Sequence, residues 1–232
     1  MRMMIAFGRF LELSLPAPDV LESLDFYRRL GFTEFPTGDI RRWHYAVVSD
    51  GTVTIGLHAS GFEEATLSFV RPEVAMQVRA LEAQGQEFEW RRLGTDDFNE
   101  AALRTVDGQL IRMMEARTFS PAGVPAASLL GTTCSEVTLH CDAPERTRAW
   151  LESLGFVAEP DPPSAGTVHV ASPGLRLGLR VGPRTDAASL RFRPADPGAV
   201  AAALAARDLQ PVRGRAGYEI KAPEGTRLIV ES

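Results

Sequence analysis

Apolar and polar residues alternate along a segment that occurs twice in the chain. Residues 12–32 read ELSLPAPDVLESLDFYRRLGF and residues 136–156 read EVTLHCDAPERTRAWLESLGF, and the two align without a gap at an offset of 124 residues. Each begins with a glutamate inside an alternating apolar run, and this period of two is typical of a strand. The offset is far longer than a solenoid repeat, so it predicts two homologous domains.

Each half of the chain divides again into two similar parts. After a strand at 11–15, Asp19 and Glu22 form a capping box for a helix that ends at Gly31. Three strand-like runs follow, at 32–36, 43–48 and 53–58. The same β-α-β-β-β order recurs between 66 and 115 and twice more in the second half. We therefore predict an α+β fold of four βαβββ modules with curved mixed sheets.

The domain limits follow from composition. Residues 118–132 are rich in Pro, Ala, Gly, Ser and Thr, which is typical of a linker. The sequence therefore predicts a first domain at 7–117, a linker at 118–132 and a second domain at 133–232, each domain with two modules.

The strand alternation also assigns faces. In the first strand, leucines at 11, 13 and 15 alternate with Glu12 and Ser14. The aliphatic set is expected to pack against the helices, which leaves the polar set on the opposite face of the sheet. A sheet with a polar inner face, built twice, favours a ligand cleft over a dry core.

Composition narrows the class of protein. The 232 residues are 44% hydrophobic with a net charge of −5, which favours a globular protein and gives no sign of a nucleic-acid-binding face. No run approaches the roughly 18 apolar residues that span a membrane. Cys134 and Cys141 would lie about 23 Å apart on one strand, too far for a disulfide. We expect a cytoplasmic monomer or homodimer without nucleic-acid or membrane partners.

One motif resembles a known superfamily. It reads D-x-x-x-S-L-x-F-Y-x-x-L-G-F, and its residues are Asp19, Ser23, Leu24, Phe26, Tyr27, Leu30, Gly31 and Phe32. With paired βαβββ modules, it resembles the vicinal oxygen chelate superfamily, which includes glyoxalase I, extradiol dioxygenases and bleomycin resistance proteins. The resemblance covers almost the whole chain and implies two tandem glyoxalase/bleomycin-resistance-like domains.

The resemblance also implies where a metal would lie. Metal-dependent members hold a divalent ion with His, Glu or Gln from the first and last strands of paired modules. The corresponding positions here are Glu12, Gly56, Ala65 and Arg112, and Glu136, Gly178, Ala188 and Ile229. Each domain keeps one of these ligands, and one carboxylate does not hold a divalent ion. We therefore expect no cofactor, with a divalent metal as the alternative.

A buried glutamate without a metal needs another partner. We predict that Arg112, with His58, pairs with Glu12 in the first domain and that Arg180 pairs with Glu136 in the second. In this hypothesis an internal charge pair takes the place of the ion in each domain.

These observations favour a small-molecule-binding protein over an enzyme. No nucleophile elbow or glycine-rich phosphate loop is present, and catalytic residues cannot be named. We expect the first-domain cleft to bind a small aromatic or cationic molecule. The predicted ligand-binding residues are Glu12, Ser14, Trp43, His44, His58, Trp90 and Arg112. The alternative is a metal-dependent lyase, isomerase or dioxygenase with a displaced site at Glu12, His44 and His58.

Overall fold

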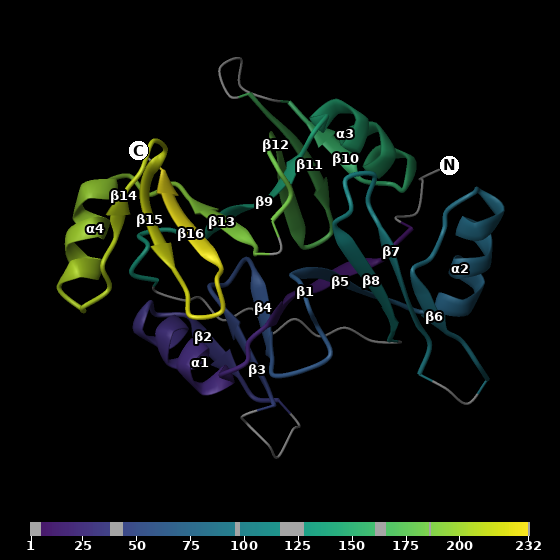
Figure 1. Ribbon diagram of the computed structural model, residues 1–232, viewed down its shortest axis with the longest axis horizontal. Helices are drawn as coiled ribbons and strands as arrows, with labels where there is room; N and C mark the ends of the chain where they lie inside the picture. The colour runs from purple at the N-terminus through teal and green to yellow at the C-terminus, as the bar shows by residue number, and fades with distance from the viewer. Residues whose placement is uncertain are drawn as a thin grey trace. The chain divides into compact units, whose positions relative to one another are not determined.

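The computed structural model describes residues 6–37, 44–95, 98–116, 128–160, 166–185 and 187–231. Within these residues it contains the four predicted βαβββ modules (Figure 1). The first module consists of β1 (Arg9–Pro16), α1 (Val20–Arg29), β2 (Thr33–Phe35), β3 (Tyr45–Ser49) and β4 (Thr54–His58). The second consists of β5 (Thr66–Arg71), α2 (Val74–Ala83), β6 (Trp90–Arg92), β7 (Glu100–Arg104) and β8 (Leu110–Glu115).

The second half of the chain repeats this order. The third module consists of β9 (Cys134–Cys141), α3 (Pro144–Ser153), β10 (Val157–Glu159), β11 (Thr167–Ser172) and β12 (Leu175–Val181). The fourth consists of β13 (Ser189–Phe192), α4 (Pro197–Ala205), β14 (Val212–Arg213), β15 (Gly217–Lys221) and β16 (Arg227–Glu231). The predicted helix start at Asp19 is confirmed, because its side chain accepts a 2.9 Å hydrogen bond from the backbone N–H of Glu22.

The strands form two mixed sheets, which confirms the predicted α+β class. One has the order β2-β3-β4-β1-β5-β8-β7-β6 and the other β10-β11-β12-β9-β13-β16-β15-β14. The first strand of a module runs parallel to its last strand, as β1 does with β4, β5 with β8 and β13 with β16. The other strands of a module are antiparallel neighbours, as β3 is to β4 and β7 to β8.

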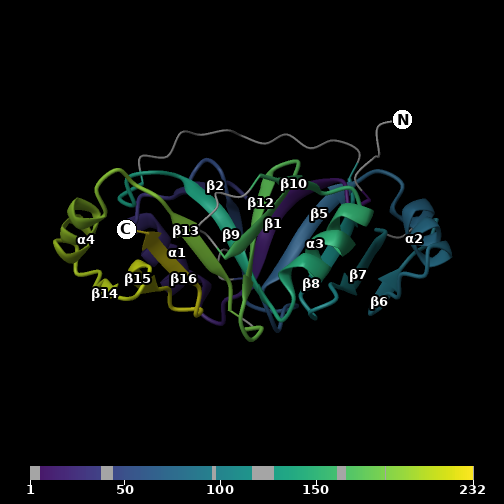
Figure 2. The ribbon, with the colours of Figure 1, turned by 90° about the horizontal axis from the view of Figure 1, so that it is seen from above.

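The predicted faces are present. On β1, Leu13 and Leu15 are 1% and 2% exposed and lie beside Ile55 and Leu57 of β4, on the face that α1 covers. Both views show α2 against the strands of its own module and α4 against those of its own (Figures 1 and 2). The polar face is buried as well, because Glu12 is only 3% exposed. Its polar side chains must therefore satisfy one another inside the protein.

The chain forms two compact units that each draw on both halves of the sequence. The first unit contains Met1–Glu12, Thr66–Pro121 and Leu139–Arg184, so it combines the second and third modules. The second unit contains Leu13–Ala65, Ala122–Thr138 and Thr185–Ser232, so it combines the first and fourth modules. The predicted domain limits describe the repeat in the sequence and stay a prediction. The compact units of the structure are divided differently, because each takes one module from each half of the chain.

A cluster of phenylalanines forms the core of the first unit. Phe7 lies 5.6 Å from Phe69 and 6.2 Å from Phe156 between ring centroids, and Phe10 lies 5.6 Å from Phe69. These edge-on and tilted rings come from the segment before β1, from β1 and β5, and from the segment after α3, so they join the second and third modules.

In each unit, a hydrogen bond from a helix of one module to a carboxylate of the other joins the two modules, and the helix residues occupy equivalent positions of the repeat. In the second unit, Ser23 Oγ and Tyr27 Oη of α1 donate hydrogen bonds of 2.9 and 2.7 Å to Glu224, in the turn between β15 and β16. In the first unit, Thr147 of α3 donates its hydroxyl to Asp107, in the turn between β7 and β8. Ser23 and Thr147 are 124 residues apart, so the repeat conserves the contact. The family-like Ser and Tyr positions thus hold modules together.

No helix in the described part of the chain combines the length and apolar character that a membrane crossing requires.

Candidate functional site

The inner face of the fourth module carries paired charges where the sequence predicted a ligand cleft. Glu136 of β9 lies opposite Arg191 of β13, and Arg191 lies beside Ile229 of β16. The Glu136 side chain is completely buried and that of Arg191 is 8% exposed. Arg191 Nε lies 3.5 Å from Glu136 Oε1 and donates a 3.0 Å hydrogen bond to Thr138 Oγ1. The glutamate that the repeat retains is therefore held by an arginine on the neighbouring strand.

Two further residues extend this contact into a network. Arg193 Nη2 lies 3.3 Å from Glu136 Oε2. Glu231 of β16 accepts hydrogen bonds from Arg191 Nη1 at 2.6 Å and from Arg193 Nε at 2.5 Å. We call Glu136, Arg191, Arg193 and Glu231 the arginine–glutamate network. Its two arginines and two glutamates alternate, so each buried charge faces an opposite one.

The network and a neighbouring pair shift several pKa values. Burial alone would raise the pKa of Glu231, but hydrogen bonds from Arg193 and Arg191 outweigh it, and the pKa lies below its usual value. Beside the network, Arg227 donates hydrogen bonds of 2.6 and 2.7 Å to both oxygens of Glu219. These bonds lower the pKa of Glu219 and raise that of Arg227. Both carboxylates are therefore ionised at neutral pH and are poor candidates for a general acid.

The second module presents an aromatic ring on its inner face. Trp90 of β6, Ala102 of β7 and Arg112 of β8 are direct neighbours across three strands. Trp90 is 39% exposed, and the Arg112 guanidinium lies 6.0 Å from the centroid of the Trp90 ring. This distance is within the range of a cation–π contact.

A buried carboxylate organises the residues around this ring. Arg112 Nε donates a 3.0 Å hydrogen bond to Glu100 Oε2, and Arg92 Nη1 lies 3.2 Å from Glu100 Oε1. Glu100 is 5% exposed, whereas the Arg92 side chain is 66% exposed. We call Trp90, Arg92, Glu100 and Arg112 the Trp90 cluster. Trp90 and Arg112 were predicted from the sequence, whereas Glu100 and Arg92 were not, although the period of two on β6 and β7 places them on the same face.

The histidines predicted to line the cleft lie in the first module. The His58 ring lies between aromatic rings, 4.6 Å from Tyr45 and 4.4 Å from Phe62. His44 is exposed in the turn before β3, and its backbone carbonyl accepts a hydrogen bond from Ala59. Trp43 lies outside the described residues. His58 therefore packs against two tilted aromatic rings of the first module.

The remaining predicted ligand-binding residues are buried. Glu12 is 3% exposed and Ser14 is 1% exposed, so neither side chain is open to a ligand arriving from solvent. The predicted pairings of Glu12 with Arg112 and of Glu136 with Arg180 stay predictions. In the structure Arg112 forms an ion pair with Glu100. Glu136 forms ion pairs with Arg191 and Arg193.

The metal-ligand positions do not carry a set of donors that fits a divalent ion. The strand register places Arg191 beside Glu136, whereas Ala188, the residue expected at this position, precedes β13. Nowhere in the described ranges do three or more His, Cys, Asp or Glu side chains form a group that could hold a metal ion. Glu12, His44 and His58 are all among the described residues and do not form such a group, so the displaced site there stays a prediction.

No family model and no curated protein matches the chain by sequence, whereas solved structures match it in fold. Homoprotocatechuate 2,3-dioxygenase from Arthrobacter globiformis has a TM-score of 0.68 at 15% identity, over 98% of this chain and 81% of that one. A variant of the Brevibacterium fuscum enzyme scores 0.64 at 15% identity, over 100% and 73%. A 2,3-dioxygenase from Pseudomonas scores 0.61 at 13% identity, over 97% and 92%.

These matches identify the fold. The chain has the fold of the extradiol dioxygenases, which are members of the vicinal oxygen chelate superfamily. The resemblance seen in the sequence motif is confirmed at this level. At identities of 13–15% the likeness concerns the fold and leaves the reaction and the ligand open.

The comparison corrects one expectation. We expected no cofactor, but the structural neighbours are extradiol dioxygenases, a class of metal-dependent enzymes, so that expectation is not supported. The residues at the superfamily's ligand positions still do not fit a divalent ion, because a single glutamate there lies against arginines.

Proposed function

We propose that the chain binds a small aromatic molecule on the Trp90 cluster. The observation that carries the proposal is the exposed Trp90 ring on the face that α2 leaves uncovered, with the Arg112 guanidinium 6.0 Å from its centroid. Glu100 holds Arg112 in place, so the arginine and the indole are preorganised. A planar ligand can stack on the ring and contact the guanidinium edge in the same pose.

Two observations favour an aromatic ligand over a cationic one. Arg92 and Arg112 lie on the same face as Trp90, where a cationic group would meet charges of its own sign. The solved structures with this fold are named for homoprotocatechuate and catechol, and both are aromatic. The likeness to these dioxygenases supports the choice of aromatic probes, and the Trp90 cluster provides the residues that would contact them.

The test is isothermal titration calorimetry of the full chain with homoprotocatechuate and with catechol. We expect at least one probe to bind, and we expect Trp90→Ala to weaken it about tenfold, which corresponds to about 1.4 kcal/mol of lost stacking. Trp90→Phe, which keeps a ring, should retain most of the affinity. A control is Met76→Ala, because Met76 is an even more exposed apolar residue, at 56%, and lies on α2. Unchanged binding in Trp90→Ala would exclude this site.

A second candidate is ring cleavage, which the dioxygenase fold favours. It is tested by oxygen consumption of the wild-type chain with homoprotocatechuate and added ferrous ion. Oxygen uptake that Trp90→Ala abolishes would place catalysis at the same face and would require metal donors other than the strand positions described above. Uptake equal to that of free ferrous ion would leave binding as the function.

A further inference from the structure

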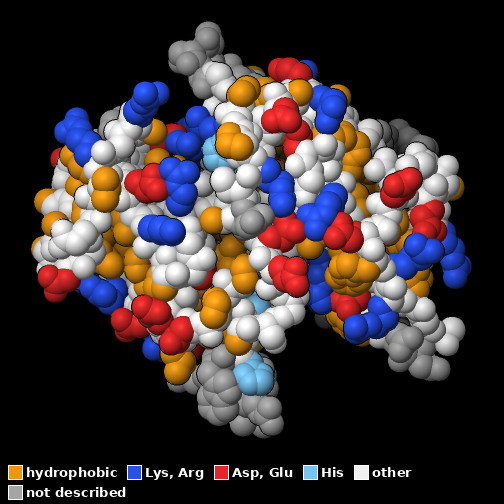
Figure 3. All heavy atoms as spheres, in the orientation of Figure 1, with side chains coloured by type: hydrophobic (Ala, Val, Ile, Leu, Met, Phe, Trp, Pro, Cys, Tyr) orange, Lys and Arg blue, Asp and Glu red, His pale blue; other side chains and the backbone are white. Residues whose placement is uncertain are grey.

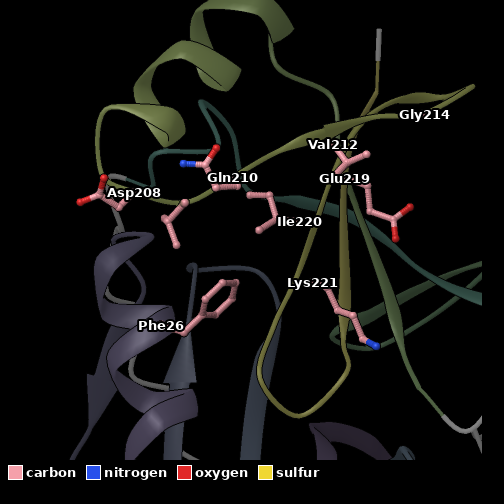
Figure 4. A pocket seen from close by; sticks show the side chains of 9 residues that line it. Phe26, Asp208, Gln210, Val212, Gly214, Glu219, Ile220 and Lys221 are labelled. Atoms are coloured by element: carbon pink, nitrogen blue, oxygen red, sulfur yellow. The ribbon is translucent and has the colours of Figure 1, made fainter.

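A cavity in the second unit is distinct from the Trp90 cluster, which lies in the first unit. It has a volume of about 570 Å³ and lies between α1 and the segment from the end of α4 to β15. Its apolar wall is formed by Phe26, Leu209 and Ile220. The Phe26 and Ile220 side chains face one another in Figure 4. These three residues are 5–8% exposed, and cavities of a few hundred Å³ are typical of small-molecule sites.

The rim of this cavity carries the only lysine in the chain. Apart from the histidines, all other basic residues are arginines, whereas Lys221 ends β15 and lines the cavity. Within the described residues, no carboxylate forms an ion pair with its amine. The Lys221 Cε atom lies about 4.0 Å from the position a Cβ would take on Gly225, so the stem runs past the turn between β15 and β16. The ammonium group is therefore available to a ligand.

The acids near the cavity leave this charge in place. Glu219, two residues before Lys221, is bound through both oxygens by Arg227, so its charge is neutralised. Asp208 lies at the opposite end, and its carboxylate points away from Phe26 and Ile220 (Figure 4). Basic side chains gather over β14 to β16 on the face shown in Figure 3. The end of the cavity at Lys221 is thus complementary to an anion.

We propose that this cavity binds a small molecule with an apolar body and an anionic group. The apolar body lies against Phe26, Leu209 and Ile220, and the anionic group contacts the Lys221 ammonium at the rim. A strongly hydrated ammonium suits a carboxylate that stays partly in water, because neither ion has to be fully desolvated. This site is independent of the Trp90 cluster, which lies in the other unit.

The experiment uses octanoate and octylamine, which share an apolar body and differ in the sign of the charge. We expect octanoate to bind with a Kd of about 1 mM, a value reasonable for a ligand of this size, and octylamine to bind about tenfold more weakly. Because Lys221 is the only lysine, reductive methylation with ¹³C-formaldehyde labels one side chain while keeping its charge. We expect its NMR signal to shift as octanoate is added.

Variants separate this site from a general effect of charge. Lys221→Glu should weaken octanoate binding about tenfold by replacing attraction with repulsion, and Lys221→Arg should change it less than about twofold. Arg79→Glu is the matched control, since it changes the net charge equally at an exposed position of α2. Tighter binding of octylamine, an unmoved Lys221 signal, or equal losses in Arg79→Glu and Lys221→Glu would each overturn the proposal.

Discussion

Replacing Arg191 with methionine tests whether the arginine–glutamate network holds the second unit together. The Arg191 side chain is 8% exposed and contacts Thr138, Glu136 and Glu231 at 3.0, 3.5 and 2.6 Å. Methionine keeps much of the volume but removes the charge, so the buried Glu136 loses its neighbour on β13. Breaking a buried ion pair from one side costs about 3–5 kcal/mol.

Arg193 limits this loss, because it still lies 3.3 Å from Glu136 and hydrogen-bonds to Glu231 in the variant. We therefore expect the free energy of unfolding to fall by about 3 kcal/mol, the lower end of that range. The measurement is equilibrium unfolding in urea followed by far-ultraviolet circular dichroism. Arg193→Met is the matched control, since this side chain meets the same two glutamates but is 45% exposed, and it should cost about 1 kcal/mol or less.

A double-mutant cycle isolates the contact between the two buried partners. Arg191→Met combined with Glu136→Gln should destabilise the chain less than the sum of the single changes, by about 1–2 kcal/mol, because the remaining partner is no longer an uncompensated charge. Equal unfolding midpoints for Arg191→Met and Arg193→Met, or additive single effects, would refute the idea that burial makes Arg191 the critical partner of Glu136.

Two further predictions concern stability. Tyr27→Phe removes a 2.7 Å hydrogen bond to Glu224 and should lower the free energy of unfolding, measured in urea, by about 1.5 kcal/mol. Thr147→Val should have a similar effect, because it removes the hydrogen bond to Asp107. A change below about 0.3 kcal/mol in both variants would contradict the role of these contacts. The pKa values of Glu231 and Glu219 are lowered in the folded chain. The two carboxylates therefore stabilise the folded chain above about pH 4.5, and this stabilisation is lost as the pH falls through their folded pKa values. A urea midpoint that stays constant from pH 6 to pH 3 would contradict this.

Local patterns in the sequence determined the elements of this protein. The 124-residue repeat and the helix signals between Asp19 and Gly31 predicted the modules, because caps and turns depend on residues a few positions apart. The alternation along β1 placed Leu13 and Leu15 against the helix, since a strand has only two faces. The motif that includes Ser23 and Tyr27 indicated the superfamily fold.

Tertiary structure alone decided which modules pack together and which charges meet. Each compact unit combines modules from both halves of the chain, and no local periodicity records this choice because all four modules offer similar faces. Arg191 and Arg193 read as ordinary strand charges in the sequence, yet they are the partners of Glu136. A buried carboxylate has to find its counter-charge across strands 55 or more residues away, so this partner depends on the register of β9 with β13. The cavity at Lys221 depends in the same way on α1 meeting β15.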